Sequence, residues 1–170
     1  MKGVHTLFLD FDGVLHPDAV FLSSKGPMLN GPGDLFMWSS HLSGVLASFP
    51  SVSLVLSTSW VRHLGFNRAV KALPPAIATR VIGATWHSTM EKGWLDEQKW
   101  DGSTRYNQIC RYAARANLSN WVALDDDTEG WLMDSRQRLV ACDPTLGMSD
   151  INTQQNLATS LTKLVSGTTS

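Results

Sequence analysis

The sequence predicts an α/β fold of three layers, in which a central parallel sheet is covered by helices on both faces. Short apolar runs alternate along the chain with segments whose apolar residues recur at helical spacing. Two of those runs end abruptly in aspartates, at Asp10 and at Asp125. Because ligands of such sheets bind beyond the carboxyl ends of the strands, the same observations indicate where a site is expected.

The expected elements follow one another in order. Strands are expected at 4–9, 52–56, 81–82, 121–124 and 139–141. Helices are expected from Asp34 to Pro50, at 61–73, from Ser103 or Thr104 to Ala116, and from Ser149 or Asp150 onward. The last helix is expected to turn Ile151, Leu157, Leu161 and Leu164 inward. Residues 16–33 are rich in Pro, Gly and Ser, which predicts an exposed loop or flap.

The bulk composition fits one domain over residues 1–166, followed by a tail at 167–170 that we expect to fray. The chain has 170 residues, of which 43% are hydrophobic and 17% charged, enough to bury a core. A formal net charge of -1 argues against strong non-specific binding to nucleic acid. The sequence shows no signal peptide and no membrane-length apolar span, so we expect a cytoplasmic protein without a membrane partner.

The segment 7–14 carries the clearest chemistry. Asp10 and Asp12 directly follow a buried strand and precede Gly13, which permits a sharp turn. A second acidic run, 125–127, follows another strand. Two like charges about 4 Å apart at an effective dielectric near 20 repel by roughly 4 kcal/mol, so a shared site calls for a cation, and carboxylates with water favour Mg²⁺. An ordinary turn is the alternative; a calcium loop is not, because no Glu stands at the twelfth position.

These two acidic segments resemble motifs of the haloacid dehalogenase-like (HAD) hydrolase superfamily. In the first, three apolar residues precede Asp10-x-Asp12-Gly, and Val14 stands where the family usually has Thr. In the second, an apolar strand leads into Asp125 and Asp126. The resemblance implies a Rossmann-like, HAD-like fold. Insertion points at 15–49 and 60–99 are too short for a large cap domain, so we expect a minimal cap or none.

Two further segments resemble the phosphate-binding motifs of the superfamily. A strand ends in Ser57, Thr58 and Ser59, of which we favour Thr58 as the phosphate ligand. A basic residue is required near the start of the helix before the fourth strand, and we choose Arg105, with Lys99 as the alternative. Taken from the residues alone, each hydroxyl is as readily a helix cap and Arg105 as readily a solvent-facing side chain.

Within the superfamily, the chain resembles small capless members, including the HAD domains associated with RNA repair. That resemblance rests on three segments: 57–60, Trp121 leading into the acids of the fourth strand, and 143–148 before the final helix.

The resemblance implies a phosphatase mechanism built on the first motif. Asp10 would attack phosphorus and form an aspartyl-phosphate, while Asp12 would protonate the leaving oxygen and then activate water. Mg²⁺ would be held by Asp10, by the backbone carbonyl of Asp12, and by Asp126 or Asp125.

The expected function is therefore a Mg²⁺-dependent phosphatase with an open site. Its substrate would be a phosphorylated small molecule, a nucleic acid end or a phosphoprotein. Trp60 and Trp86 could stack on a base and His16 could touch substrate, although core packing and solvation are the simpler interpretations. Two alternatives remain: another phosphotransferase of the superfamily, such as a phosphomutase, and a non-catalytic HAD-like binding or regulatory module.

Overall fold

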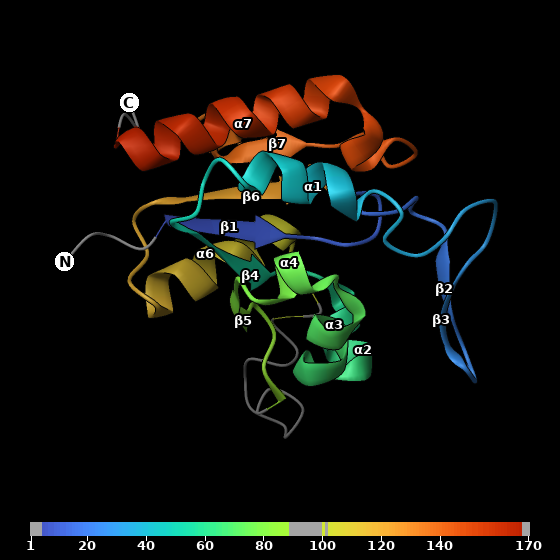
Figure 1. The fold of residues 1–170 in the computed structure, drawn as a ribbon. Coiled ribbons are helices and arrows are strands. Elements are labelled where there is room, and N and C mark those ends of the chain that lie inside the picture. The colour runs from blue at the N-terminus through green and yellow to red at the C-terminus, as the bar shows by residue number, and fades with distance from the viewer. Residues whose placement is uncertain (1–4, 89–99, 101, 168–170) are drawn as a thin grey trace.

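A computed structural model describes residues 5–88, 100 and 102–167 of the chain (Figure 1). The central sheet contains β1 (His5–Leu9), β4 (Val52–Leu56), β5 (Val81–Ala84), β6 (Trp121–Asp125) and β7 (Leu139–Ala141), in the order β5-β4-β1-β6-β7. Every neighbouring pair in it is parallel. The predicted sheet is confirmed, and the carboxyl ends of its strands share one edge.

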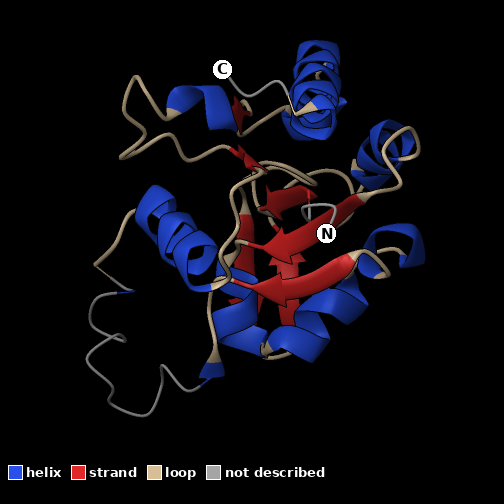
Figure 2. Ribbon diagram, turned by 90° about the vertical axis from the view of Figure 1, so that its left-hand side faces the viewer, coloured by secondary structure: helices blue, strands red, loops and turns tan. Residues whose placement is uncertain are grey.

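Helices cover both faces of this sheet (Figure 2). They are α1 (Ser39–Leu46), α2 (Ser59–Leu64), α3 (Phe66–Ala72), α4 (Pro75–Ala78), α6 (Arg105–Arg115) and α7 (Ile151–Ser166), with short 3-10 helices at Arg136–Arg138 and Gly147–Ser149. Alternate residues of β1 face opposite sides: Leu7 and Leu9 join the core formed with α1 and α7, while Phe8 joins the core formed with α6. Each such buried side chain contributes roughly 1.5–3 kcal/mol of burial free energy.

The flap expected at 16–33 contains a hairpin that the sequence did not predict. Strands β2 (Val20–Ser23) and β3 (Gly26–Leu29) pair with each other in antiparallel fashion and form a separate two-stranded sheet. None of their residues is buried, so no alternation of buried and exposed residues marks them in the sequence. The hairpin extends from the main body beside α2 and α3 (Figure 1).

Several helix boundaries differ from the prediction for local reasons. The helix predicted at 61–73 is two helices, because Gly65 has a φ of +85° and a ψ of +156° and breaks the helical path. Helix α1 begins at Ser39, and Asp34 does not cap it. Ile151 is the exposed first residue of α7, so its predicted inward orientation is wrong. The caps predicted for α6 and α7, Thr104 and Asp150, are confirmed by side-chain hydrogen bonds to backbone amides.

Within the described residues, no cap domain covers the carboxyl edge of the sheet, and none of the helices is long and apolar enough to cross a membrane. Gly167 ends α7 in a left-handed conformation. Residues 168–170 lie outside the described residues, so the frayed tail stays a prediction, as does the single-domain boundary.

Candidate active site

Three carboxylates meet at the carboxyl edge of the sheet. Strands β1 and β6 are neighbours, and the amide of Asp10 donates to the carbonyl of Leu124 at 3.2 Å, which aligns their ends. One carboxylate oxygen from each of Asp10, Asp125 and Asp126 lies within 4.8 Å of the other two. Oxygen ligands of Mg²⁺ sit about 2.1 Å from the ion, so ligands on opposite sides are about 4.2 Å apart. Small side-chain movements would therefore let the three oxygens share one Mg²⁺.

Burial and mutual repulsion make ionisation of these acids costly. Burial, and then the charge of Asp125, raise the pKa of Asp10 well above its ordinary value, while Arg105 opposes the rise. Burial raises the pKa of Asp125 to about 7, again against the effect of Arg105. Burial and then the charge of Asp18 raise the pKa of Asp126. A divalent cation among the three carboxylates favours their ionised forms and so acts against all of these shifts.

Arg105 is the cation that the described part of the chain brings to this cluster. Its Nη2 lies 3.7 Å from Asp10 Oδ1, and its Nε lies 3.3 Å from Asp125 Oδ2. Burial lowers the pKa of the guanidinium, but the charges of Asp10 and Asp125 outweigh burial and raise it. Arg105 opens α6, where the helix dipole disfavours a positive charge, so the acids account for its position. Lys99, the alternative to Arg105, lies outside the described residues.

Gly13 lets the first acidic segment approach the second. Its φ is +74°, and a Cβ at this position would overlap the carboxyl group of Asp126. Only glycine combines this backbone conformation with such a close approach at no steric cost. The predicted turn is therefore present, and it brings Asp126 directly against the segment that carries Asp10.

Asp12 lies in a different environment. The indole Nε1 of Trp60 donates to both of its carboxylate oxygens at 3.1 Å. The Nε2 of His16 lies 2.9 Å from Oδ1 of the same carboxylate. The amide of Phe36 donates to Nδ1 of His16 at 3.1 Å. Because Nδ1 accepts that bond, the ring hydrogen is on Nε2, and His16 is a second donor to Asp12.

Four rings, which we call the aromatic cage, hold these donors in place: Phe11, His16, Phe36 and Trp60. Their neighbouring centroids are 5.0 to 5.7 Å apart, mostly in edge-to-face contact. Phe36 has a φ of +61°, a left-handed conformation that costs a non-glycine residue roughly 1–2 kcal/mol. Phe36 is also the residue whose amide fixes His16, which in turn binds Asp12. The backbone strain therefore lies in a residue that helps to position Asp12.

The strand β4 brings the predicted hydroxyl residues to the same edge of the sheet. The amide of Ser57 donates to the carbonyl of Leu9 at 2.8 Å, and Ser57 Oγ is buried without a hydrogen-bond partner among the described residues. Thr58 Oγ1 accepts from the amide of Trp60 at 3.3 Å and caps α2. Ser59 is the first residue of that helix. Their roles as phosphate ligands stay predictions.

The structure brings together the acidic side chains expected as metal ligands, namely Asp10 and both alternatives, Asp125 and Asp126. The carboxylate of Asp12 is not part of the cluster formed by the described residues, and its backbone carbonyl stays a predicted ligand. His16, suggested as a substrate contact, is fully buried and supports Asp12 instead. Trp60 and Trp86 are also buried for most of their surface. The position of His16, four residues after Asp12, was the one signal in the sequence that it could reach that carboxylate.

The parallel sheet and the acidic cluster at its carboxyl edge are the features expected of the HAD superfamily of hydrolases and phosphotransferases. Residues 6–153 match the family described as the HAD domain in Swiss Army Knife RNA repair proteins, and the chain belongs to that family. No curated protein and no solved structure matches the chain.

Proposed function

We propose that this chain is a Mg²⁺-dependent phosphomonoester hydrolase with Asp10 as its nucleophile. The observation that carries the proposal is the cluster at the sheet edge, where Asp10, Asp125 and Asp126 present oxygens within 4.8 Å of one another. Arg105 contacts two of these three acids. Membership of the HAD superfamily supports phosphoryl chemistry at such a cluster.

In the first step, an oxygen of Asp10 attacks phosphorus, a new P–O bond forms, and the ester P–O bond breaks. When bound by the three acids, Mg²⁺ supplies the positive charge that lets an anionic carboxylate approach an anionic phosphate. Arg105, 3.7 Å from Asp10, neutralises charge on the phosphoryl group as it transfers. Thr58, or Ser57 with its buried hydroxyl, donates a hydrogen bond to a phosphate oxygen.

Asp12 supplies a proton and then takes one back. In the first step its proton goes to the leaving oxygen. In the second step the Asp12 carboxylate takes a proton from a water molecule, which attacks phosphorus and breaks the bond to Asp10. Trp60 and His16 orient the carboxylate and stabilise its charge. The side chain of Asp12 is 22% exposed, so water can reach it, which favours hydrolysis over transfer to a second substrate.

We propose a nucleotide or a nucleic-acid end as the carrier of the phosphate. The match to HAD domains of RNA repair proteins supports this substrate class. A phosphorylated small molecule of another kind and a phosphoprotein are the alternatives, and the substrate panel below distinguishes them.

The proposal is tested by measuring the release of inorganic phosphate from a panel of esters. The panel contains p-nitrophenyl phosphate, nucleoside monophosphates, oligonucleotides with a 3′ or 5′ phosphate, and phosphopeptides. We expect release with Mg²⁺, its loss in EDTA, and its recovery when Mg²⁺ is restored. The proposal would be contradicted if none of the esters released phosphate. Release that EDTA leaves unchanged would also contradict it. The chromogenic ester alone is an insufficient test, because enzymes of macromolecular substrates can ignore small esters.

A further inference from the structure

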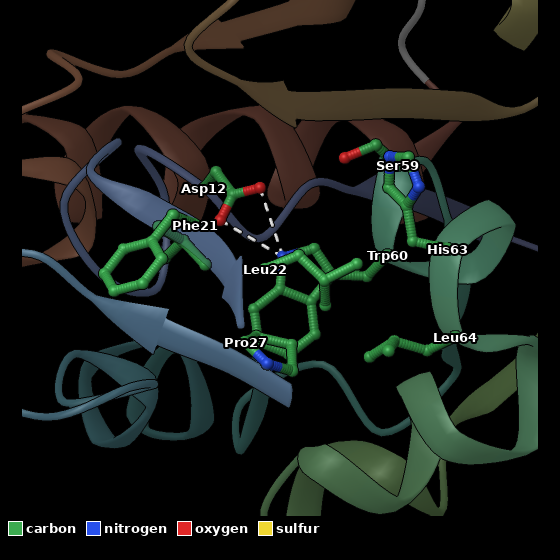
Figure 3. A pocket seen from close by; sticks show the side chains of 9 residues that line it. Asp12, Phe21, Leu22, Pro27, Ser59, Trp60, His63 and Leu64 are labelled. Carbon is green, nitrogen blue, oxygen red and sulfur yellow. Dashed lines mark hydrogen bonds between the residues drawn. The ribbon is translucent and has the colours of Figure 1, made fainter. Parts of the chain in front are cut away.

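A groove of about 160 Å³ lies between the β2–β3 hairpin and helix α2, beside the cage that holds Asp12 (Figure 3). We call it the hairpin groove, and its main lining residues are Asp12, Phe21, Leu22, Pro27, Trp60 and His63. Figure 3 shows the bond from the indole of Trp60 to Asp12, with Phe21 on one side and His63 on the other. The Asp12 carboxylate is therefore part of the wall of a groove that also presents large apolar side chains.

The hairpin contributes apolar side chains that its own packing does not explain. Its two strands form a sheet separate from the central one. Phe21 is 49% exposed and Leu22 is more exposed still, although both are large and apolar. Exposed apolar side chains gathered beside a polar functional group are typical of a ligand-binding surface.

The position of Asp12 determines which part of a substrate this groove would receive. In the function proposed above, on which this inference rests, Asp12 gives its proton to the oxygen of the leaving group. That oxygen must lie within about 3 Å of the carboxylate, so the group attached to it lies next to Asp12. Asp12 lines the hairpin groove, so this groove is placed to receive that group.

We propose that the hairpin groove is the leaving-group subsite and that it binds the single-ring base of a nucleotide. A cavity of about 150 Å³ is enough to accept a benzene molecule, so 160 Å³ suits one six-membered ring and is small for the two fused rings of a purine. Phe21 and Leu22 supply apolar surface against which the flat ring packs. Ser59 and His63, on the opposite wall, offer hydrogen-bonding groups to the polar edge of a base, which a plain phenyl ring could not use.

The test compares kcat/KM for uridine 5′-monophosphate with kcat/KM for ribose 5-phosphate, which carries the same ester without the base. We expect the wild type to prefer the uridine ester by about tenfold or more, since stacking of one base contributes on that scale. Adenosine 5′-monophosphate should do no better than the uridine ester. Phe21→Ala should remove most of the preference, and an unchanged circular dichroism spectrum shows that the variant is folded.

Met28→Ala is the matched control. Met28 pairs directly with Phe21 across the hairpin, and its exposed fraction of 46% is similar to the 49% of Phe21. Met28 does not line the groove. We expect this variant to keep the wild-type preference. Equal wild-type kcat/KM values for the two esters would overturn the proposal. The same loss of preference in Phe21→Ala and Met28→Ala would also overturn it. A preference for phosphotyrosine over the uridine ester that disappears in Phe21→Ala would overturn it in favour of a protein substrate.

Binding to the Asp10→Asn variant separates failure of this subsite from failure of the proposed function. Calorimetry with Mg²⁺ present measures the affinities for uridine 5′-monophosphate and ribose 5-phosphate without turnover. Tighter binding of the uridine ester, lost in Asp10→Asn/Phe21→Ala, supports the base site even if the wild type hydrolyses neither ester. Equal affinities overturn the base site even if the wild type is an active phosphatase.

Discussion

Asp10 and Asp12 are two residues apart in the chain and lie in opposite environments. Asp10 is almost fully buried between two other acids and a guanidinium. Asp12 is partly exposed and receives hydrogen bonds from two neutral ring N–H groups. The first environment needs a cation and suits a nucleophile, whereas the second orients a carboxylate that exchanges protons with solvent. In the proposed mechanism, one short segment therefore divides two tasks between its two acids.

Removal of the proposed nucleophile, Asp10, should disturb the first environment most. We expect Asp10→Asn to lower phosphatase turnover by at least about 10³-fold with the fold intact, because the neutral amide of the same shape cannot attack phosphorus. Asp127→Asn is the control: it lies in the same acidic run, outside the cluster, and Asp127 Oδ1 accepts a backbone bond that an amide oxygen can also accept. Full activity of Asp10→Asn in a phosphate-release assay would refute Asp10 as nucleophile.

Removal of one donor tests the second environment. Trp60→Phe keeps the ring but deletes the N–H that binds Asp12, and hydrogen bonds to charged groups contribute about 1.5–3 kcal/mol. We therefore expect kcat to fall roughly 10- to 100-fold with little change in KM. In Trp131→Phe, the deleted N–H has no partner among the described residues, so kcat should stay unchanged. Equal kcat losses in the two variants, or a change confined to KM, would show that Trp60 does not position Asp12.

The approach of the two acidic segments is tested at Gly13. Gly13→Ala and Gly167→Ala both place alanine at nearly the same φ, +74° and +72°, so both carry the same backbone strain of roughly 1–2 kcal/mol. Only at Gly13 does the new methyl group displace Asp126, because Gly167 has open space around it. We expect Gly13→Ala alone to weaken Mg²⁺ binding, by about tenfold, in a calorimetric titration. Unchanged affinity in Gly13→Ala would mean that Asp126 does not hold the ion.

The smallest expected effect is the pH dependence of Mg²⁺ stabilisation. Burial raises the pKa of Asp125 from 3.8 to about 7, so the metal-free folded chain binds more protons than the unfolded chain across that interval. Its stability should therefore fall as pH rises from about 4 to about 7. At ten times its dissociation constant, Mg²⁺ should add about 1.4 kcal/mol, or roughly 3–6 °C in Tm. The Tm increase caused by Mg²⁺ should be larger at pH 8 than at pH 5, because protons compete with Mg²⁺ for the carboxylates at pH 5. Equal increases at the two pH values would contradict this.

The sequence predicted the first environment much better than the second. Apolar runs that end in Asp10 and Asp125 define strands, and the parallel pairing of β1 and β6 then brings those ends together. The surroundings of Asp12 depend instead on contacts that leave no local pattern. Trp60 reaches it from 48 positions away, and the amide that fixes His16 belongs to Phe36 in a strained conformation.

The hairpin escaped prediction for a related physical reason. Its residues pack against little, so burial does not impose alternation on them, and Pro27 lies within β3. The break at Gly65 was missed because apolar residues continue at helical spacing on both sides of it. In both places the backbone conformation, and not the pattern of hydrophobic residues, determines the secondary structure.

The most direct test of the central claim is chemical trapping of the phosphorylated carboxylate. An acyl phosphate is reduced by borohydride, which converts the aspartate that carried it to homoserine, and peptide mass spectrometry then identifies the position. With substrate and Mg²⁺ present, we predict homoserine at position 10 and an unchanged residue at position 12. Turnover with modification at Asp12, or at neither acid, would contradict the division of tasks between them.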